Sequence, residues 1–227
     1  EMAVGLMLIA ACPGGVTSNL ITHVSRGDTA LSITLTAVAS FITIVTIPLL
    51  LGWSLDHFMG DARTVSVPVG KTILQIAVIT VLPVSIGMII RRYAPEFADR
   101  MERPARIGSA IIFTLITLGI IAANLDLLKE HFLPLSGVTL ALNVVTMLLG
   151  FVIATVAALK MPQRLSITIE SGIQNGTMAI VIATTILKQG DLALPAAVYS
   201  LIMFMTGAVI MIVFGAIKDP RAGSNAT

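Results

Sequence analysis

The chain has 227 residues, of which 56% are hydrophobic and only 11% are charged. A soluble domain usually carries about 25% charged residues, so this composition excludes an ordinary soluble fold and predicts a polytopic membrane protein. The formal net charge of +2 gives no reason to expect a nucleic-acid partner, and a lone cysteine, Cys12, excludes an internal disulfide.

Seven apolar stretches reach the roughly 20 residues that a membrane-spanning helix needs. In chain order they are Met2–Ser25, Thr29–Leu55, Pro68–Ile90, Ile107–Leu125, Phe132–Leu159, Leu165–Leu187 and Leu192–Ile217. The loops between them are short, and the strongest boundary is the arginine-rich segment 91–106. We therefore predict an all-α membrane protein with seven spans in the sequence.

Lysine and arginine are distributed unequally between the two sides of this topology. Ten of them fall on the side that holds the C-terminus and the loops after the first, third and fifth spans, and four fall on the other side. Because cytoplasmic loops are enriched in positive charge, this distribution predicts a cytoplasmic C-terminus.

Two of the seven spans are interrupted in the middle. The first contains Cys12-Pro13-Gly14-Gly15, where proline removes a backbone donor and the glycines weaken the helix further. The sixth is interrupted at Gly172-Ile173-Gln174-Asn175-Gly176. Each broken span precedes a long unbroken one, and the two pairs are an odd number of spans apart, so they should cross the membrane in opposite directions. Inverted repeats with discontinuous helices are typical of transporters, and the breaks mark the binding site.

This symmetry predicts the domain organisation. Residues 1–64 are expected to be the end of a first repeat, with the broken helix 2–25 and the span 29–55. Residues 65–227 are expected to be the second, inverted repeat, with the spans 68–90, 107–125, 132–159, 165–187 and 192–217. Because the second repeat has five helices, we expect a ten-helix (5+5) parent protein, with three further helices before Glu1.

Glu170 is the one carboxylate inside an apolar segment of membrane length. A charge at that depth costs several kcal/mol unless something pairs with it, so it marks a functional site. No lysine or arginine lies between Leu165 and Leu187 to neutralise it. The positive charge must therefore come from another helix, a helix end, a proton or a bound cation.

Neutral oxygen donors accompany Glu170 around both breaks. They are Ser18, Asn19, Ser32, Thr36, Gln174 and Asn175. Ser32 and Thr36 are four residues apart and therefore share one helix face. One negative charge with many neutral oxygens suits Na⁺ and does not suit Zn²⁺, which prefers histidine and cysteine.

Sequence motifs at both breaks carry a family resemblance over the whole chain. They are Gly5-Leu6-Met7-Leu8, Cys12-Pro13-Gly14-Gly15, Ser18-Asn19, Arg26-Gly27-Asp28, Ala30-Leu31-Ser32 and Glu170-Ser171-Gly172-Ile173-Gln174-Asn175. Together these motifs resemble the bile acid:sodium symporter family. The resemblance implies a ten-helix fold with a panel domain and a core domain, the core holding the two crossing broken helices, and two sodium sites.

The resemblance also assigns residues to those sites. The first sodium site would use Ser18, Asn19, Ser32, Thr36 and Glu170. The second would use Glu170, Gln174 and the backbone carbonyls of Ser171 and Ile173, together with a glutamine from a helix that this sequence does not contain. Asn19, Asn175 and Gly176 would bind the substrate.

By this resemblance the protein is expected to be a sodium-coupled symporter that works by alternating access. Its substrate would be an organic anion, either bile-acid-like or a small carboxylate such as pantoate or a keto acid. Two alternatives stay open: a proton-coupled transporter that uses Glu170, since burial disfavours a charged carboxylate, and a truncated membrane protein that does not transport. No enzymatic motif is present. We expect a monomer in a bacterial inner membrane, with lipid and a small anion as partners.

Overall fold

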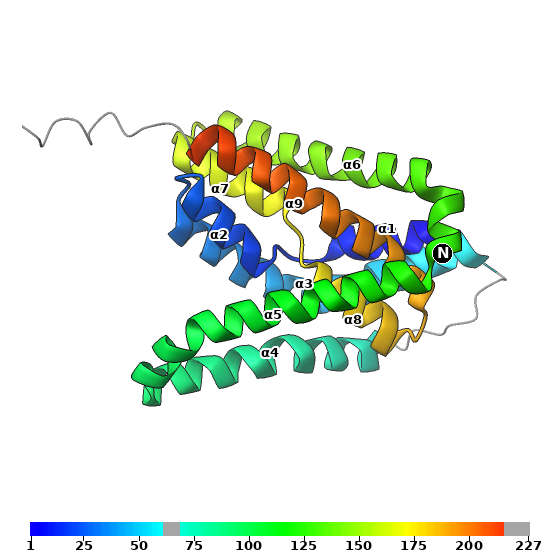
Figure 1. Ribbon diagram of the computed structural model, residues 1–227, viewed down its shortest axis with the longest axis horizontal. Coiled ribbons are helices and arrows are strands. Elements are labelled where there is room, and N and C mark those ends of the chain that lie inside the picture. The colour runs from blue at the N-terminus through cyan, green and yellow to red at the C-terminus, as the bar shows by residue number, and fades with distance from the viewer. Residues whose placement is uncertain (61–68, 216–227) are drawn as a thin grey trace, which may run out of the picture.

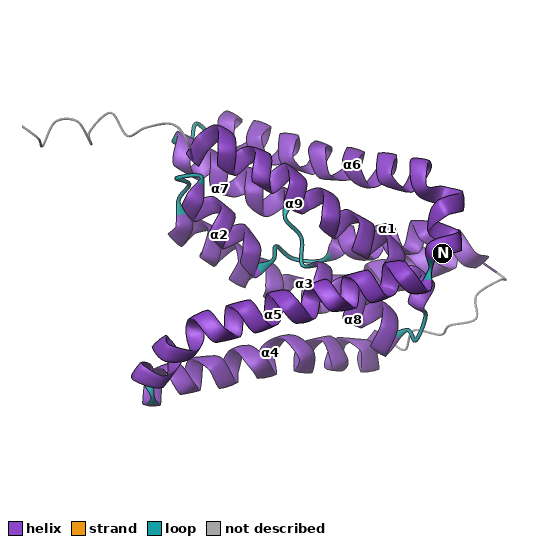
Figure 2. Cartoon of the chain, in the orientation of Figure 1, coloured by secondary structure: helices purple, strands orange, loops and turns teal. Residues whose placement is uncertain are grey.

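The computed structural model describes residues 1–60 and 69–215, and in this part of the chain every regular element is helical (Figures 1 and 2). Within residues 1–60 and 69–215, five helices are long and apolar enough to cross a membrane. The prediction of an all-α polytopic membrane protein is therefore confirmed. The expected repeat boundary at residues 64 and 65, the start of the third span at Pro68 and the end of the last span at Ile217 lie outside the described residues.

Both interrupted spans are broken where the sequence predicts. The first consists of α1 (Met2–Ala11) and α2 (Val16–Val24). The second consists of α7 (Met161–Gly172), α8 (Gly176–Val181) and a π-helical turn, η2 (Ile182–Ile186). The two broken helices run in opposite directions, and their non-helical segments meet near the middle of the molecule (Figure 2).

The unbroken helices among the described residues are α3 (Thr29–Met59), α4 (Val69–Tyr93), α5 (Pro95–Ala123), α6 (Leu125–Val156) and α9 (Leu194–Gly215), the last preceded by a 3₁₀ turn, η3 (Gly190–Ala193). Four of these five, α3 to α6, are longer than the predicted spans, and α9 begins two residues later than its predicted span.

The boundary expected over residues 91–106 is corrected to a single non-helical residue, Ala94. Pro95 occupies the first turn of α5, where its missing N–H is not needed, and Glu96 lies close to the positive end of the helix dipole. Arginine and glutamate are good helix formers, so the charged segment continues the helix.

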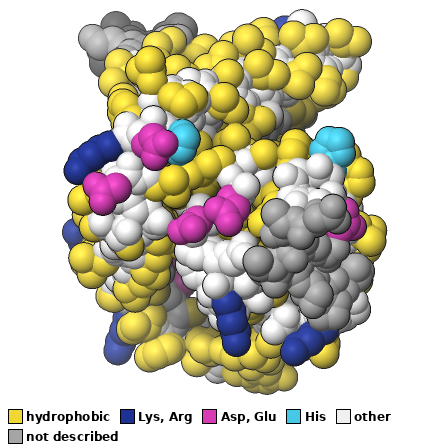
Figure 3. Space-filling view, turned by 90° about the vertical axis from the view of Figure 1, so that its right-hand side faces the viewer, with side chains coloured by type: hydrophobic (Ala, Val, Ile, Leu, Met, Phe, Trp, Pro, Cys, Tyr) yellow, Lys and Arg dark blue, Asp and Glu magenta, His cyan; other side chains and the backbone are white. Residues whose placement is uncertain are grey.

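The helices pack as a bundle with one lightly buried edge. Helix α6 packs on α7 and α9, and α1 packs on α3 and α9, whereas α4 and α5 form a pair along the lower edge of Figure 1. In the apolar windows of α4 and α5 only 6% of residues are buried, against 33% for α9. The exposed residues of this pair are largely apolar, which suits contact with lipid or with other apolar helices. On the end of the bundle that Figure 3 shows, acidic and histidine side chains lie among apolar ones, and basic side chains lie nearer the edges of the view.

The most deeply buried part of the bundle surrounds α1, the second break and the start of α9. Leu192, Ala196 and Tyr199 are fully buried there. Gly5 allows α1 to approach closely, because a Cβ at this position would lie 2.5 Å from the carbonyl oxygen of Leu192. That oxygen belongs to the backbone and cannot move aside easily.

We expect Gly5→Ala to lower the free energy of unfolding by about 1–3 kcal/mol, since an overpacked methyl group forces a backbone shift. Thermal unfolding of the purified protein in detergent measures the change. Gly52→Ala is the matched control, because Gly52 is also helical but has no atom within 4 Å of an added Cβ. The control should be unchanged or more stable by about 0.5–1 kcal/mol. Equal melting temperatures for the two variants would contradict the close packing of α1.

Candidate functional site

The non-helical segments of the two broken helices pair with each other through their backbones. Gly14 and Gln174 form an isolated antiparallel bridge. On either side of it, the Gly15 N–H donates to the Ile173 carbonyl at 3.0 Å and the Asn175 N–H donates to the Pro13 carbonyl at 2.8 Å. Unpaired backbone groups are costly at membrane depth, so this pairing is what allows two helices to be broken there.

Side chains satisfy two further carbonyls at the end of α7. The Ser171 carbonyl accepts from Gln174 Nε2 at 3.0 Å. The Gly172 carbonyl accepts from Asn143 Nδ2 at 2.8 Å and from the Tyr199 hydroxyl at 2.9 Å. Neither Asn143 nor Tyr199 is among the residues predicted from the sequence to form the site. An asparagine in the middle of the apolar span 132–159 is the signal that could have identified the first of them.

Three hydroxyl groups converge on the carboxylate of Glu170, which is 8% exposed. Ser18 from α2 donates to Oε2 at 2.6 Å, and Ser32 from α3 donates to the same oxygen at 3.0 Å. Thr36, one turn further along α3, donates to Oε1 at 2.5 Å. The structure therefore brings together four of the predicted site residues from three different helices.

Gly14 lies directly against this carboxylate. A Cβ at position 14 would overlap Oε1 of Glu170. The glycine of the first break is therefore needed both for the unwound backbone and for the approach of the second broken helix.

The hydroxyls around Glu170 have more acceptors than protons. Ser18 Oγ also lies 2.6 Å from the Gly15 carbonyl, and Thr36 Oγ1 lies 3.0 Å from the Ser32 carbonyl. Each hydroxyl has one hydrogen to donate, so Ser18 and Thr36 cannot make full hydrogen bonds to both of their acceptors. A cation bound among these oxygens, or a proton on Glu170, would neutralise the carboxylate and satisfy the acceptors that lack a donor.

No basic side chain supplies that charge among residues 1–60 and 69–215. The ion pairs Arg91–Asp99, Lys129–Asp126 and His131–Glu130 join exposed side chains on α4, α5 and α6. The described residues also contain no group of three or more histidine, cysteine or acidic side chains that could hold a metal. The donor set at Glu170 thus consists of hard oxygens, which suit an alkali cation and not a transition metal.

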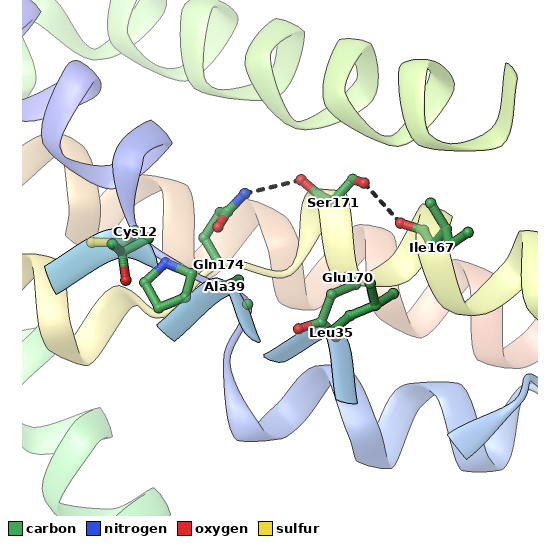
Figure 4. A pocket seen from close by; sticks show the side chains of 10 residues that line it. Cys12, Leu35, Ala39, Ile167, Glu170, Ser171 and Gln174 are labelled. Atoms are coloured by element: carbon green, nitrogen blue, oxygen red, sulfur yellow. Dashed lines mark hydrogen bonds between the residues drawn. The ribbon is translucent and has the colours of Figure 1, made fainter. Parts of the chain in front are cut away.

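A cavity of about 280 Å³ opens beside the crossing (Figure 4). Its lining comes from both breaks, from α3 and from α7: Cys12, Pro13, Gly14, Leu35, Ala39, Thr43, Ile167, Glu170, Ser171 and Gln174. Gln174 Oε1 is buried and has no hydrogen-bond partner in the described part of the protein. Glu170 and Gln174 therefore bring carboxylate and amide oxygens to one cavity.

The residues predicted to bind substrate are placed differently. Asn175 caps α8, its Oδ1 accepting from the Met178 N–H at 3.0 Å, and Gly176 packs against Ser200 on α9. Asn19 is half-buried on α2, and its Oδ1 has no partner among the described residues. None of these three residues lines the cavity at Glu170.

An all-α membrane protein in which two broken helices cross beside a buried carboxylate has the architecture of a secondary transporter. The chain belongs to the sodium bile acid symporter family, whose sequence profile matches residues 1–131. Members of this family are transporters and not enzymes, so the prediction of a non-enzymatic protein is confirmed.

Three relatives illustrate the similarity. The sodium-dependent transporter YocS of Bacillus subtilis is 26% identical over all of this chain and 69% of its own length. The probable sodium/metabolite cotransporter BASS2 of Oryza sativa is 27% identical over 93% of this chain and 49% of its own length. The human ileal sodium/bile acid cotransporter is 28% identical over 76% of this chain and 49% of its own length. The match thus covers about half of the two eukaryotic relatives.

Thr36 and Thr34 offer a matched test of the contacts to Glu170. Thr36→Val removes a hydrogen bond to a buried carboxylate, so we expect it to lower the free energy of unfolding by about 1.5–3 kcal/mol. Thr34 lies on the same helix but is exposed and bonds only to the Ala30 carbonyl of its own helix. Thr34→Val should therefore change stability by no more than about 0.5 kcal/mol. Thermal unfolding in detergent without added Na⁺ compares the two, and equal losses would contradict the assignment.

Proposed function

We propose that the protein is a sodium-coupled symporter of an organic anion, with Na⁺ bound at Glu170. The observation that carries the proposal is the convergence of three hydroxyls on a buried carboxylate that no basic side chain in the described residues neutralises. Na⁺ would serve here as the co-transported ion, and its charge would offset that of the carboxylate.

The first sodium site would contain Ser18, Asn19, Ser32, Thr36 and Glu170. The unused lone pairs of the hydroxyls suit a hard monovalent cation, and the unpartnered Oδ1 of Asn19 is available on the same helix as Ser18.

The second site would contain Glu170, Gln174 and the carbonyls of Ser171 and Ile173. The buried, unpartnered Oε1 of Gln174 supports it. Both carbonyls already accept one hydrogen bond, and each keeps a second lone pair for a cation.

The organic anion would bind at the crossing, near Asn19, Asn175 and Gly176. The half-helix α2 begins at Val16 beside the crossing, and the N-terminal end of a helix carries partial positive charge that favours an anion. Two of the three relatives named above are a sodium/bile acid cotransporter and a probable sodium/metabolite cotransporter. An anion of either kind, bile-acid-like or a small carboxylate such as pantoate or a keto acid, fits this chemistry.

Coupling would follow from alternating access. Na⁺ at Glu170 would organise the crossing, and the substrate site would form on the crossing once it is organised. The core that contains the crossing would then move against the panel helices. In this proposal residues 1–64 and 65–227 belong to two inverted repeats of a ten-helix protein, in a bacterial inner membrane with the C-terminus in the cytoplasm.

A proton is the alternative coupling ion. The same excess of acceptors over donors around Glu170 favours it, because a proton on the carboxylate would also relieve that excess. The number of neutral oxygens at the crossing supports Na⁺, since a proton needs only one acceptor.

Glu170→Gln tests the function by keeping the shape of the side chain and removing its charge. We expect Na⁺-dependent uptake of the organic anion into proteoliposomes to disappear. The rise in melting temperature on replacing choline chloride with NaCl should also be lost, because a ligand stabilises only a protein that binds it. Glu130→Gln is the control, since Glu130 is exposed. Wild-type uptake that is equal in Na⁺ and choline would overturn the proposal, and if it also collapsed with the pH gradient it would establish the proton alternative.

A further inference from the structure

Two buried side chains, one on α6 and one on α9, donate hydrogen bonds to one backbone oxygen at the end of α7. Asn143 on α6 and Tyr199 on α9 both donate to the Gly172 carbonyl, at 2.8 and 2.9 Å. Both residues are fully buried, and they contact each other at 3.3 Å. We call this pair of donors the Gly172 clamp.

The Gly172 clamp acts on the peptide group at which the helix ends. Gly172 is the last residue of α7, and Ile173 after it has left the helical conformation, with φ −97° and ψ 88°. The Gly172 carbonyl is held by side chains of α6 and α9. The next carbonyl along the chain, that of Ile173, accepts instead from the N–H of Gly15 in the first break.

The amide of Asn143 is not explained by stability alone. Its Oδ1 is buried and has no hydrogen-bond partner in the described residues. A buried acceptor without a partner destabilises the folded state, and a leucine of similar size would avoid that cost. Asn143 supplies a hydrogen-bond donor to the Gly172 carbonyl, and a leucine could not do so.

We infer that Asn143 and Tyr199 are positioning residues for the cation at Glu170, a role that rests on the proposed function. They touch neither the ion nor the substrate. By fixing the Gly172 peptide they determine where α7 ends. The end of α7 in turn determines the position of Glu170, two residues earlier, and the positions of the Ser171 and Ile173 carbonyls on either side of Gly172.

The test is a double-mutant cycle with Asn143→Leu and Tyr199→Phe. The measured quantity is the Na⁺ concentration that gives half of the maximal rise in melting temperature. One donor remains in each single variant, so we expect increases of about two- to fivefold. In the double variant the Gly172 carbonyl has lost both donors, and the increase should exceed the product of the two single effects.

Two controls separate positioning from general loss of stability. The first control is Thr139→Val. Thr139 lies one turn from Asn143 on α6, and its hydroxyl donates only to carbonyls of its own helix. Tyr93→Phe removes an exposed tyrosine hydroxyl. Both should keep the wild-type half-saturation for Na⁺. The ratio of Li⁺ to Na⁺ half-saturation should also change in the clamp variants and stay constant in a variant that is only less stable.

The inference would be overturned if both single variants had the same half-saturating Na⁺ concentration as the wild type and the same ratio of Li⁺ to Na⁺ half-saturation. That result also decides the matter if the double variant does not fold. Glu170→Gln is measured in parallel. If it keeps the Na⁺ response, the proposed function itself fails. If it loses the response while the clamp variants match the wild type, only the role of Asn143 and Tyr199 fails.

Discussion

The structure depends on the burial of one carboxylate among neutral hydroxyl groups. Glu170 is held by hydroxyls from the consecutive helices α2 and α3, which precede it in the sequence by 134 to 152 residues at the contacting positions. A charge in this environment is tolerated only where it is compensated. The close approach of Gly14 and the pairing of the two breaks both serve to bring that charge and its ligands together.

The crossing also solves a backbone problem. Breaking a helix at membrane depth frees donors and acceptors that lipid cannot satisfy. Here each break satisfies part of the other through the bridge at Gly14 and Gln174, and side chains of α6 and α9 satisfy the Gly172 carbonyl. Each broken helix therefore depends on the presence of the other.

Much of this arrangement could be predicted from the sequence, for identifiable reasons. Pro13, the glycines around both breaks and the lone intramembrane carboxylate are strong local signals, and they located both breaks and Glu170. The facing of side chains is not local. An apolar span with a tyrosine or asparagine does not show which neighbour it meets, so the donors to Gly172 were missed, and the cap that Asn175 makes to α8 was not foreseen. The helical content of the arginine-rich segment was underestimated because charge marks the membrane boundary but does not end a helix.

The position of the single cysteine has a practical consequence. Cys12 lines the cavity beside Glu170 and is the only thiol in the sequence. Cys12 is also buried, and a buried thiol reacts slowly with thiol reagents because the thiolate is the nucleophile and burial disfavours it. A reagent of this kind would therefore modify Cys12 mainly when the crossing opens, so the rate of modification would measure how often the two breaks separate.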